Sequence, residues 1–202
     1  NRKKTYLSKI QTQKDQLKSN LESKKIMIAE IKKIINKLYA DKDETRKREE
    51  ELARIRSQKN KSTSGNFAKM KGKLTWPVKG KVVGKFGNVT NQKTNTVTEN
   101  LGIDILTSSN EKVYSVLDGV VLTITTIRNF GDLLILDHGA GYYTVYSNLK
   151  NISVYENQYV DTYTQLGQVA LGSNFNYPNK YTFNFQIWSN EKKLNPEIWL
   201  KK

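Results

Sequence analysis

His138 is the one histidine in this chain of 202 residues, which also has no cysteine. A catalytic zinc site takes about three protein ligands, usually His or carboxylate side chains, and leaves a further position for water. His138 lies in the run Leu136-Asp137-His138-Gly139, and no cluster of Asp or Glu at ligand spacing stands near it. We therefore interpret His138 as a strand-end residue, and we predict neither a metal nor another cofactor.

Other catalytic arrangements are no better supported by the sequence. A Ser-His-Asp triad would have to be built on His138, and the sequence has no nucleophile-elbow motif. It has no glycine-rich phosphate loop either, and no pair of carboxylates is singled out for glycoside hydrolysis. We do not expect this chain to be an enzyme.

Charge and composition divide the chain into two parts. The formal net charge is +15, of which +13 falls within residues 1–73. The basic residues there are mostly lysines without interleaved aromatics, which is typical of a solvated helix rather than of a nucleic-acid surface. We predict no nucleic-acid partner. No apolar run approaches the length of a membrane span, and we expect any signal or anchor to lie upstream of Asn1.

Residues 1–58 contain neither Gly nor Pro and are rich in strong helix formers. Their apolar residues recur with alternating three- and four-residue spacing, which predicts one strand of a coiled coil over residues 1–40. The residues of this seam are Leu7, Ile10, Leu17, Leu21, Ile28, Ile31, Ile35 and Leu38. An apolar seam of this length needs a covering partner, which we expect to come from outside these residues.

The pattern changes after Tyr39. Asp41 or Asp43 is a suitable N-cap for a second helix, with acidic residues in its first turn. Leu52 and Ile55 are the main apolar residues of this helix, and residues 57–66 are a polar linker. We expect residues 41–66 to form a regulatory helix with its linker.

From Phe67 the apolar period becomes two, and short runs rich in Val, Ile, Thr and aromatics alternate with Gly, Asn and Asp. Strands are predicted at 113–116, 119–126, 132–138, 142–149, 169–171 and 181–188. We therefore predict an α+β chain, with a helical arm followed by an antiparallel all-β domain over residues 67–202.

The β domain resembles the LytM-type (lysostaphin-like) zinc endopeptidases over about residues 74–200. The resemblance rests on the order and spacing of several short runs. They are Trp76-Pro77-Val78, Gly102-Ile103-Asp104-Ile105, Asp118-Gly119-Val120-Val121, Asp137-His138-Gly139, Tyr146-Ser147-Asn148-Leu149, Gly167-Gln168-Val169, Phe185-Gln186-Ile187 and Leu194-Asn195-Pro196.

This resemblance also implies that the zinc site has been lost. Active members carry a ligand His four residues before the ligand Asp, and Asn100 and Asp104 stand at these two positions. Asn148 replaces the His of the Tyr-Ala-His-Leu run, while Thr182 and Asn184 replace the closing His-x-His. Asparagine and threonine are poor zinc ligands, so the resemblance does not carry peptidase activity over to this chain.

Within this family the chain is most similar to EnvC-type murein hydrolase activators, in particular those of the Bacteroidetes. The resemblance implies a periplasmic protein, peripheral to the inner membrane, that activates N-acetylmuramoyl-L-alanine amidases during cell separation. An FtsE–FtsX-like division complex would act on the coiled coil. A passive peptidoglycan-binding module is the alternative, and a residual metallopeptidase is a weaker one.

A fold that has lost its metal keeps its groove, which can bind a partner. We expect the groove to carry the partner surface, and residues 41–56 to cover it through Leu52 and Ile55 until they are displaced. The expected groove residues are Asn100, Leu101, Asp104, Asn148, Asn184, Gln186 and Trp188.

Overall fold

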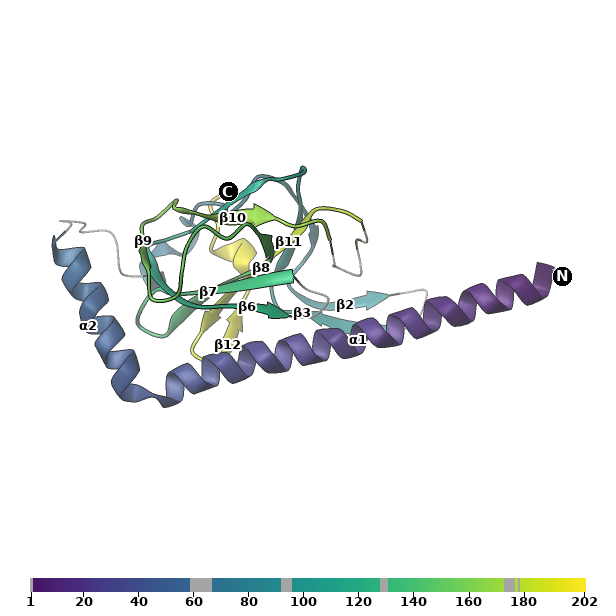
Figure 1. The fold of residues 1–202 in the computed structure, drawn as a ribbon, viewed down its shortest axis with the longest axis horizontal. Coiled ribbons are helices and arrows are strands. Elements are labelled where there is room, and N and C mark those ends of the chain that lie inside the picture. The colour runs from purple at the N-terminus through teal and green to yellow at the C-terminus, as the bar shows by residue number, and fades with distance from the viewer. Residues whose placement is uncertain (1, 59–66, 92–95, 128–130, 173–176, 178) are drawn as a thin grey trace.

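A computed structural model describes residues 2–58, 67–91, 96–127, 131–172, 177 and 179–202. Two helices, α1 (Arg2–Ala40) and α2 (Lys42–Gln58), precede a β domain, as Figure 1 shows. The predicted α+β class is therefore confirmed. Most of the predicted linker, residues 59–66, lies outside the described residues.

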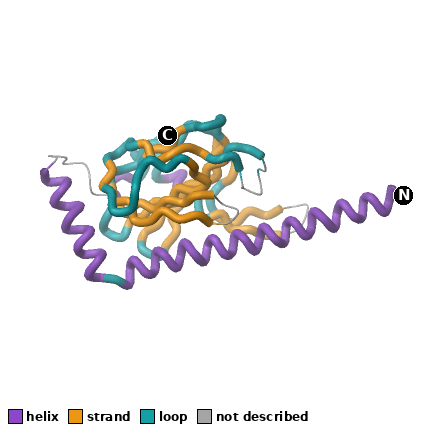
Figure 2. The backbone as a smooth tube through the Cα atoms, viewed as in Figure 1, coloured by secondary structure: helices purple, strands orange, loops and turns teal. Residues whose placement is uncertain are grey.

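The break between the helices is produced by a side-chain cap. The Asp41 carboxylate accepts a hydrogen bond from the backbone N–H of Glu44 at 3.0 Å, so Asp41, one of the two candidates from the sequence, is the N-cap. Figure 2 shows the short loop at which the chain turns away from α1. Asp43 and Glu44 in the first turn of α2, and Arg56 in its last, suit the helix dipole.

The β domain contains twelve strands and two short 3-10 helices within the described residues. The strands are β1 (Lys81–Gly84), β2 (Gly87–Asn91), β3 (Thr96–Asn100), β4 (Ile103–Leu106), β5 (Lys112–Tyr114), β6 (Gly119–Ile127), β7 (Gly131–Asp137), β8 (Tyr142–Lys150), β9 (Tyr159–Val160), β10 (Gln165–Val169), β11 (Thr182–Ser189) and β12 (Lys192–Leu194). The 3-10 helices are η1 (Phe67–Met70) and η2 (Pro196–Ile198).

Ten strands form one antiparallel sheet with the main order β1-β4-β11-β8-β7-β6-β9. Strand β10 pairs with β5 and β8, and β12 pairs with β11. Strands β2 and β3 form a separate hairpin. Because β11 lies between β4 and β8, residues 104, 147 and 184 meet in register although they are far apart in the sequence.

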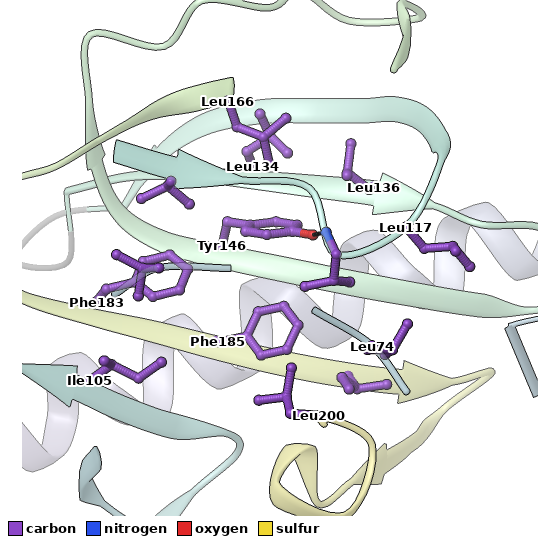
Figure 3. Packing of buried hydrophobic residues seen from close by; sticks show 14 of the residues in the cluster. Leu74, Ile105, Leu117, Leu134, Leu136, Tyr146, Leu166, Phe183, Phe185 and Leu200 are labelled. Carbon is purple, nitrogen blue, oxygen red and sulfur yellow. Dashed lines mark hydrogen bonds between the residues drawn. The ribbon is translucent and has the colours of Figure 1, made fainter. Parts of the chain in front are cut away.

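One face of the sheet carries the main core (Figure 3). Tyr146, Phe183 and Phe185 are fully buried there, and the Tyr146 hydroxyl accepts a hydrogen bond from the Val116 N–H at 3.1 Å. These aromatics are core residues, because alternate positions of β8 and β11 point inward.

The other face of the sheet is covered by the C-terminal half of α1. Met27, Ile31 and Ile35 pack in a second cluster with Leu101, Ile127, Leu133, Ile135, Tyr143, Val145 and Trp188. The expectation that the whole seam needs an outside partner is therefore wrong for this half of the helix. In the N-terminal half, Leu7 and Ile10 remain exposed.

None of the helices in the described part of the chain combines the length and the apolar character that a membrane span requires.

Candidate functional site

Asn100, Asp104 and Asn184 form a hydrogen-bonded group that we call the amide–carboxylate cluster. The Asn184 amide donates to Asp104 Oδ1 at 2.9 Å, and the Asn100 amide donates to Asp104 Oδ2 at 3.2 Å. The Asn184 amide also lies 3.2 Å from Asn100 Oδ1. Asp104 is almost fully buried, so these donors stabilise a carboxylate that has little access to water.

The cluster continues along one face of β11. Gln186 Nε2 donates to Asn184 Oδ1 at 2.9 Å, and Trp188 Nε1 donates to Gln186 Oε1 at 3.0 Å. Residues 184, 186 and 188 point to the same side because side chains alternate along a strand. The result is a directed chain of donors that begins at Trp188 and ends at the carboxylate of Asp104.

Asn148 and Thr182 lie beside this cluster, and the Asn148 side chain hydrogen-bonds to backbone groups instead of joining it. Asn148 has a φ of 66°, and its amide donates to the carbonyl oxygens of Thr182 at 2.6 Å and Ala170 at 3.1 Å. The buried Thr182 hydroxyl has no hydrogen-bond partner among the described residues. Asn148 therefore joins the end of β8 to β11 and to the segment after β10.

This donor set does not fit zinc. The cluster offers one carboxylate and two neutral amides, and both amide N–H groups already point at the carboxylate. Within the described ranges, no group of three His, Cys, Asp or Glu side chains could hold a metal ion. No metal-dependent step can be assigned to these residues.

Tyr177 is a neighbour of the cluster that the sequence analysis missed. Its hydroxyl donates to the Val83 carbonyl at 2.6 Å. Burial, followed by the charge of Asp104, raises the pKa of Tyr177. The backbone is also close here, since a Cβ added to Gly84 would lie 2.3 Å from Asp104 Oδ2. Tyr177 stands between two segments outside the described residues, in a region without a clear strand pattern, and no sequence signal indicated it.

Two of the expected groove residues lie beneath α1. Trp188 is fully buried and Leu101 is 2% exposed, both against Met27, Ile31 and Ile35. Asn100 and Asn184 are half-buried, and Asp104 and Gln186 are buried. A partner could contact Trp188 or Leu101 only after α1 had moved away.

Helix α2 contacts the domain elsewhere, through residues spaced by four. Arg48 pairs with Asp137 at 3.3 Å, and Arg56 pairs with Asp118 at 2.8 Å. Leu52 lies between the two arginines and is 1% exposed, whereas Ile55 is half-buried. These contacts are made at the end of β7, near the beginning of β8, whereas the amide–carboxylate cluster adjoins the end of β8.

His138 lies under α2 as a core residue. Its Nδ1 is 2.8 Å from the Asp118 carbonyl oxygen, and its Nε2 is 2.7 Å from the Thr144 hydroxyl. A carbonyl only accepts, so Nδ1 carries the proton and Nε2 accepts. Burial lowers the pKa of His138 to about 4. A neutral, doubly hydrogen-bonded imidazole fits the structural role that the sequence predicts.

Comparison with known families identifies the class of this domain. Residues 98–196 match the sequence model of peptidase family M23. The fold of the β domain is similar to that of a zinc-containing peptidase from Vibrio cholerae, with a TM-score of 0.53 and 23% sequence identity. The match covers 60% of this chain and 38% of that one. The β domain therefore has the M23-type, LytM-like fold, and residues 98–196 resemble that family in sequence.

Two curated relatives are more specific. The chain is 30% identical over 113 residues to the cell division protein DipM of Caulobacter vibrioides, which covers 55% of this chain and 18% of DipM. It is 29% identical over 126 residues to the murein hydrolase activator NlpD of Escherichia coli, which covers 62% of this chain and 30% of NlpD. The chain thus corresponds to less than a third of either relative.

Proposed function

We propose that this protein is a non-catalytic activator of a murein hydrolase. The observation that carries the proposal is the amide–carboxylate cluster, in which asparagines satisfy Asp104 at the positions where the family holds zinc. An intact fold with such a site can still bind a partner on the same face. The relatives named as a murein hydrolase activator and as a cell division protein support this choice.

The proposal also includes autoinhibition, but by α1 rather than by the predicted segment of residues 41–56. The helix that covers Trp188 and Leu101 is α1, through Met27, Ile31 and Ile35. Helix α2 instead contacts Asp118 and Asp137 through Arg56 and Arg48, with Leu52 near Gly139. Aromatic residues often dominate the energy of an interface. Covering Trp188 therefore keeps a strong contact point from the hydrolase.

The strength of the α1 contact suits a reversible cover. Burying Met27, Ile31 and Ile35 contributes roughly 1.5–3 kcal/mol each, from which the conformational entropy of ordering the helix is subtracted. The α1 side chains that the structure describes as buried all lie in its C-terminal half. The N-terminal half extends away from the domain and could transmit a pull to the packed half (Figure 1). A force on the N-terminal half would pull α1 from the sheet, while α2 stays anchored by its two ion pairs.

The finer parts of the proposal follow the EnvC-type resemblance, including its Bacteroidetes character. The hydrolase would be an N-acetylmuramoyl-L-alanine amidase. The protein would lie in the periplasm at the inner membrane, and an FtsE–FtsX-like complex would pull the arm. The helical arm beside a LytM-like domain with a dismantled site supports this assignment.

Dye release from labelled murein tests the proposal. A purified amidase from the same organism should release more dye when this protein is added, and this protein alone should release none. Dye release by the protein alone would contradict a non-catalytic function. Unchanged release by the amidase, both with this protein and with the Ile31→Asp, Ile35→Asp variant that frees α1 from the sheet, would contradict an activator function.

The same preparation separates the activator from a passive wall-binding module. An activator binds the amidase in the absence of murein, for example in a pull-down with the immobilised enzyme. Sedimentation with murein but no capture by the amidase would favour the wall-binding module instead.

A further inference from the structure

Tyr163 adopts a backbone conformation that a bulky residue rarely takes. Its φ is 66°, in the left-handed region. Eight non-glycine residues in the described part of the chain have a positive φ, and six of them are Asn while one is Ala. Asparagine tolerates this conformation well. The backbone conformation of the turn therefore does not explain why a tyrosine occupies position 163.

The turn that carries Tyr163 is fixed to Ser115. The Tyr163 N–H donates to the Ser115 carbonyl at 3.0 Å, and the Thr164 N–H donates to the Ser115 hydroxyl at 3.0 Å. The Ser115 hydroxyl in turn donates to the Asp161 carbonyl at 2.6 Å. Strained conformations persist where the surroundings determine them, and they gather at functional sites.

The strained backbone places the Tyr163 ring flat against the ring of Tyr114. The two ring centroids are 4.3 Å apart and the ring planes differ by 1°. Tyr163 is nevertheless 56% exposed, so the stack does not bury this ring in the domain. The outcome is a flat aromatic platform whose position is held by β5 and by the turn before β10.

We propose that Tyr163 on Tyr114 is a binding platform for a pyranose ring of a glycan strand. A flat aromatic surface contacts the C–H face of a sugar, and the sugar's hydroxyl groups stay in contact with polar neighbours. Such neighbours flank Tyr163 in the sequence as Thr162, Thr164 and Gln165. A protein interface would need a larger apolar centre than two rings.

The choice of sugar rests on the proposed murein function, whereas the platform itself shares no residue with the amide–carboxylate cluster. Binding here would hold the activator on the glycan and leave the face under α1 for the hydrolase. The two contacts would then be made by different parts of the same domain.

The trimer of N-acetylglucosamine, titrated calorimetrically into the full chain, tests the platform. Tyr163→Gly removes the ring and suits the positive φ, so it should weaken trimer binding by about tenfold or more without lowering the melting temperature. Tyr163→Phe keeps the ring and should bind as the unsubstituted protein does. Tyr155→Ala, which removes another exposed tyrosine, is the matched control and should also bind normally.

Unchanged trimer binding by Tyr163→Gly would overturn the proposal, as would the absence of binding by the unsubstituted protein. If Tyr163→Gly retained the trimer but lost the amidase, the pair would be a protein contact and the proposal would be wrong. Tyr163→Asn, with the residue that this chain uses at similar turns, replaces the glycine variant if the latter misfolds. No hydrolase is present in the titration, so its outcome is independent of the dye-release test.

Discussion

At the scale of single residues, the amide–carboxylate cluster shows how a buried carboxylate is stabilised by amide donors. Asp104 is a buried carboxylate, and a buried charge without partners would destabilise the domain. Asn100 and Asn184 supply amide donors to both of its oxygens. Gln186 and Trp188 continue the network, so the side chains at positions 184, 186 and 188 of β11 satisfy one another.

The first prediction at this scale concerns zinc. Protein purified without chelator should contain far less than one zinc per chain, because amides are poor ligands for this ion. Elemental analysis measures this content directly. The double variant Asn100→His with Asn184→His restores two imidazoles beside Asp104 and should gain zinc. About one tightly held zinc in the unsubstituted protein would contradict the account of the cluster.

A second prediction concerns His138 and pH. Its folded pKa of about 4 lies below the ordinary value near 6.5, so protonation favours the unfolded chain. The free energy of unfolding should therefore fall as the pH drops from about 6.5 toward 4. His138→Gln should be less stable at pH 7 but should lose less stability on acidification. Denaturant unfolding at pH 7 and pH 5 gives the change in the free energy of unfolding with pH for each protein. An equal change in the two proteins would contradict the role assigned to His138.

At the scale of secondary-structure elements, α2 is held mainly by charge and α1 by apolar contact. Arg48, Leu52 and Arg56 lie four residues apart and therefore share one face of α2. The two arginines pair with the buried carboxylates of Asp137 and Asp118. Burial raises the pKa of Asp137, against the hydrogen bond from Gly139 and the charge of Arg48.

This division predicts different effects for two neighbouring arginines. Arg56→Ala leaves Asp118 buried without its cation, which costs as much as ~3–5 kcal/mol when the charge stays buried. Arg54 pairs with Glu51 on the exposed side, so Arg54→Ala should leave the melting temperature unchanged. Hydrogen exchange along α2 should rise in Arg56→Ala only. Equal protection in the two variants would show that the ion pair does not anchor the helix.

The elements themselves were largely predictable from the sequence, because their signals are local. The Asp41 cap, the absence of Gly and Pro before residue 59, and the alternation in residues 182–189 each act within a few residues. The strand predicted at 169–171 instead ends at Val169. There the apolar run Val169-Ala170-Leu171 resembles a strand, but its pairing with β5 and β8 stops.

The packing of α1 on the sheet was not predictable in the same way. The spacing of Ile28, Ile31 and Ile35 indicates an apolar stripe but does not say what covers it. The covering residues, among them Leu101, Leu133 and Trp188, come from distant strands and meet only through the sheet order. For the same reason, the motif spacing predicted that Asn100, Asp104 and Asn184 belong to one site but could not predict the hydrogen bonds among them.

At the scale of the whole molecule, a strongly basic arm is joined to a nearly neutral domain. The C-terminal half of α1 is part of the domain's packing, and the N-terminal half leaves Tyr6, Leu7 and Ile10 exposed. One continuous helix therefore links the side of the sheet that carries Trp188 to a projecting end. In the proposed mechanism, this connection lets an event at the arm expose Trp188.

The most direct test of this mechanism is the affinity of the amidase for a variant in which α1 is released. Ile31→Asp with Ile35→Asp places two charges in the apolar contact, so α1 should leave the sheet and amidase binding should tighten by about tenfold or more. Ile26→Asp changes an exposed isoleucine of the same helix and is the matched control. Tighter amidase binding by the double variant, with Ile26→Asp unchanged, is the predicted result. Equal affinity of all three proteins, each shown to be folded, would contradict the claim that α1 covers the partner surface.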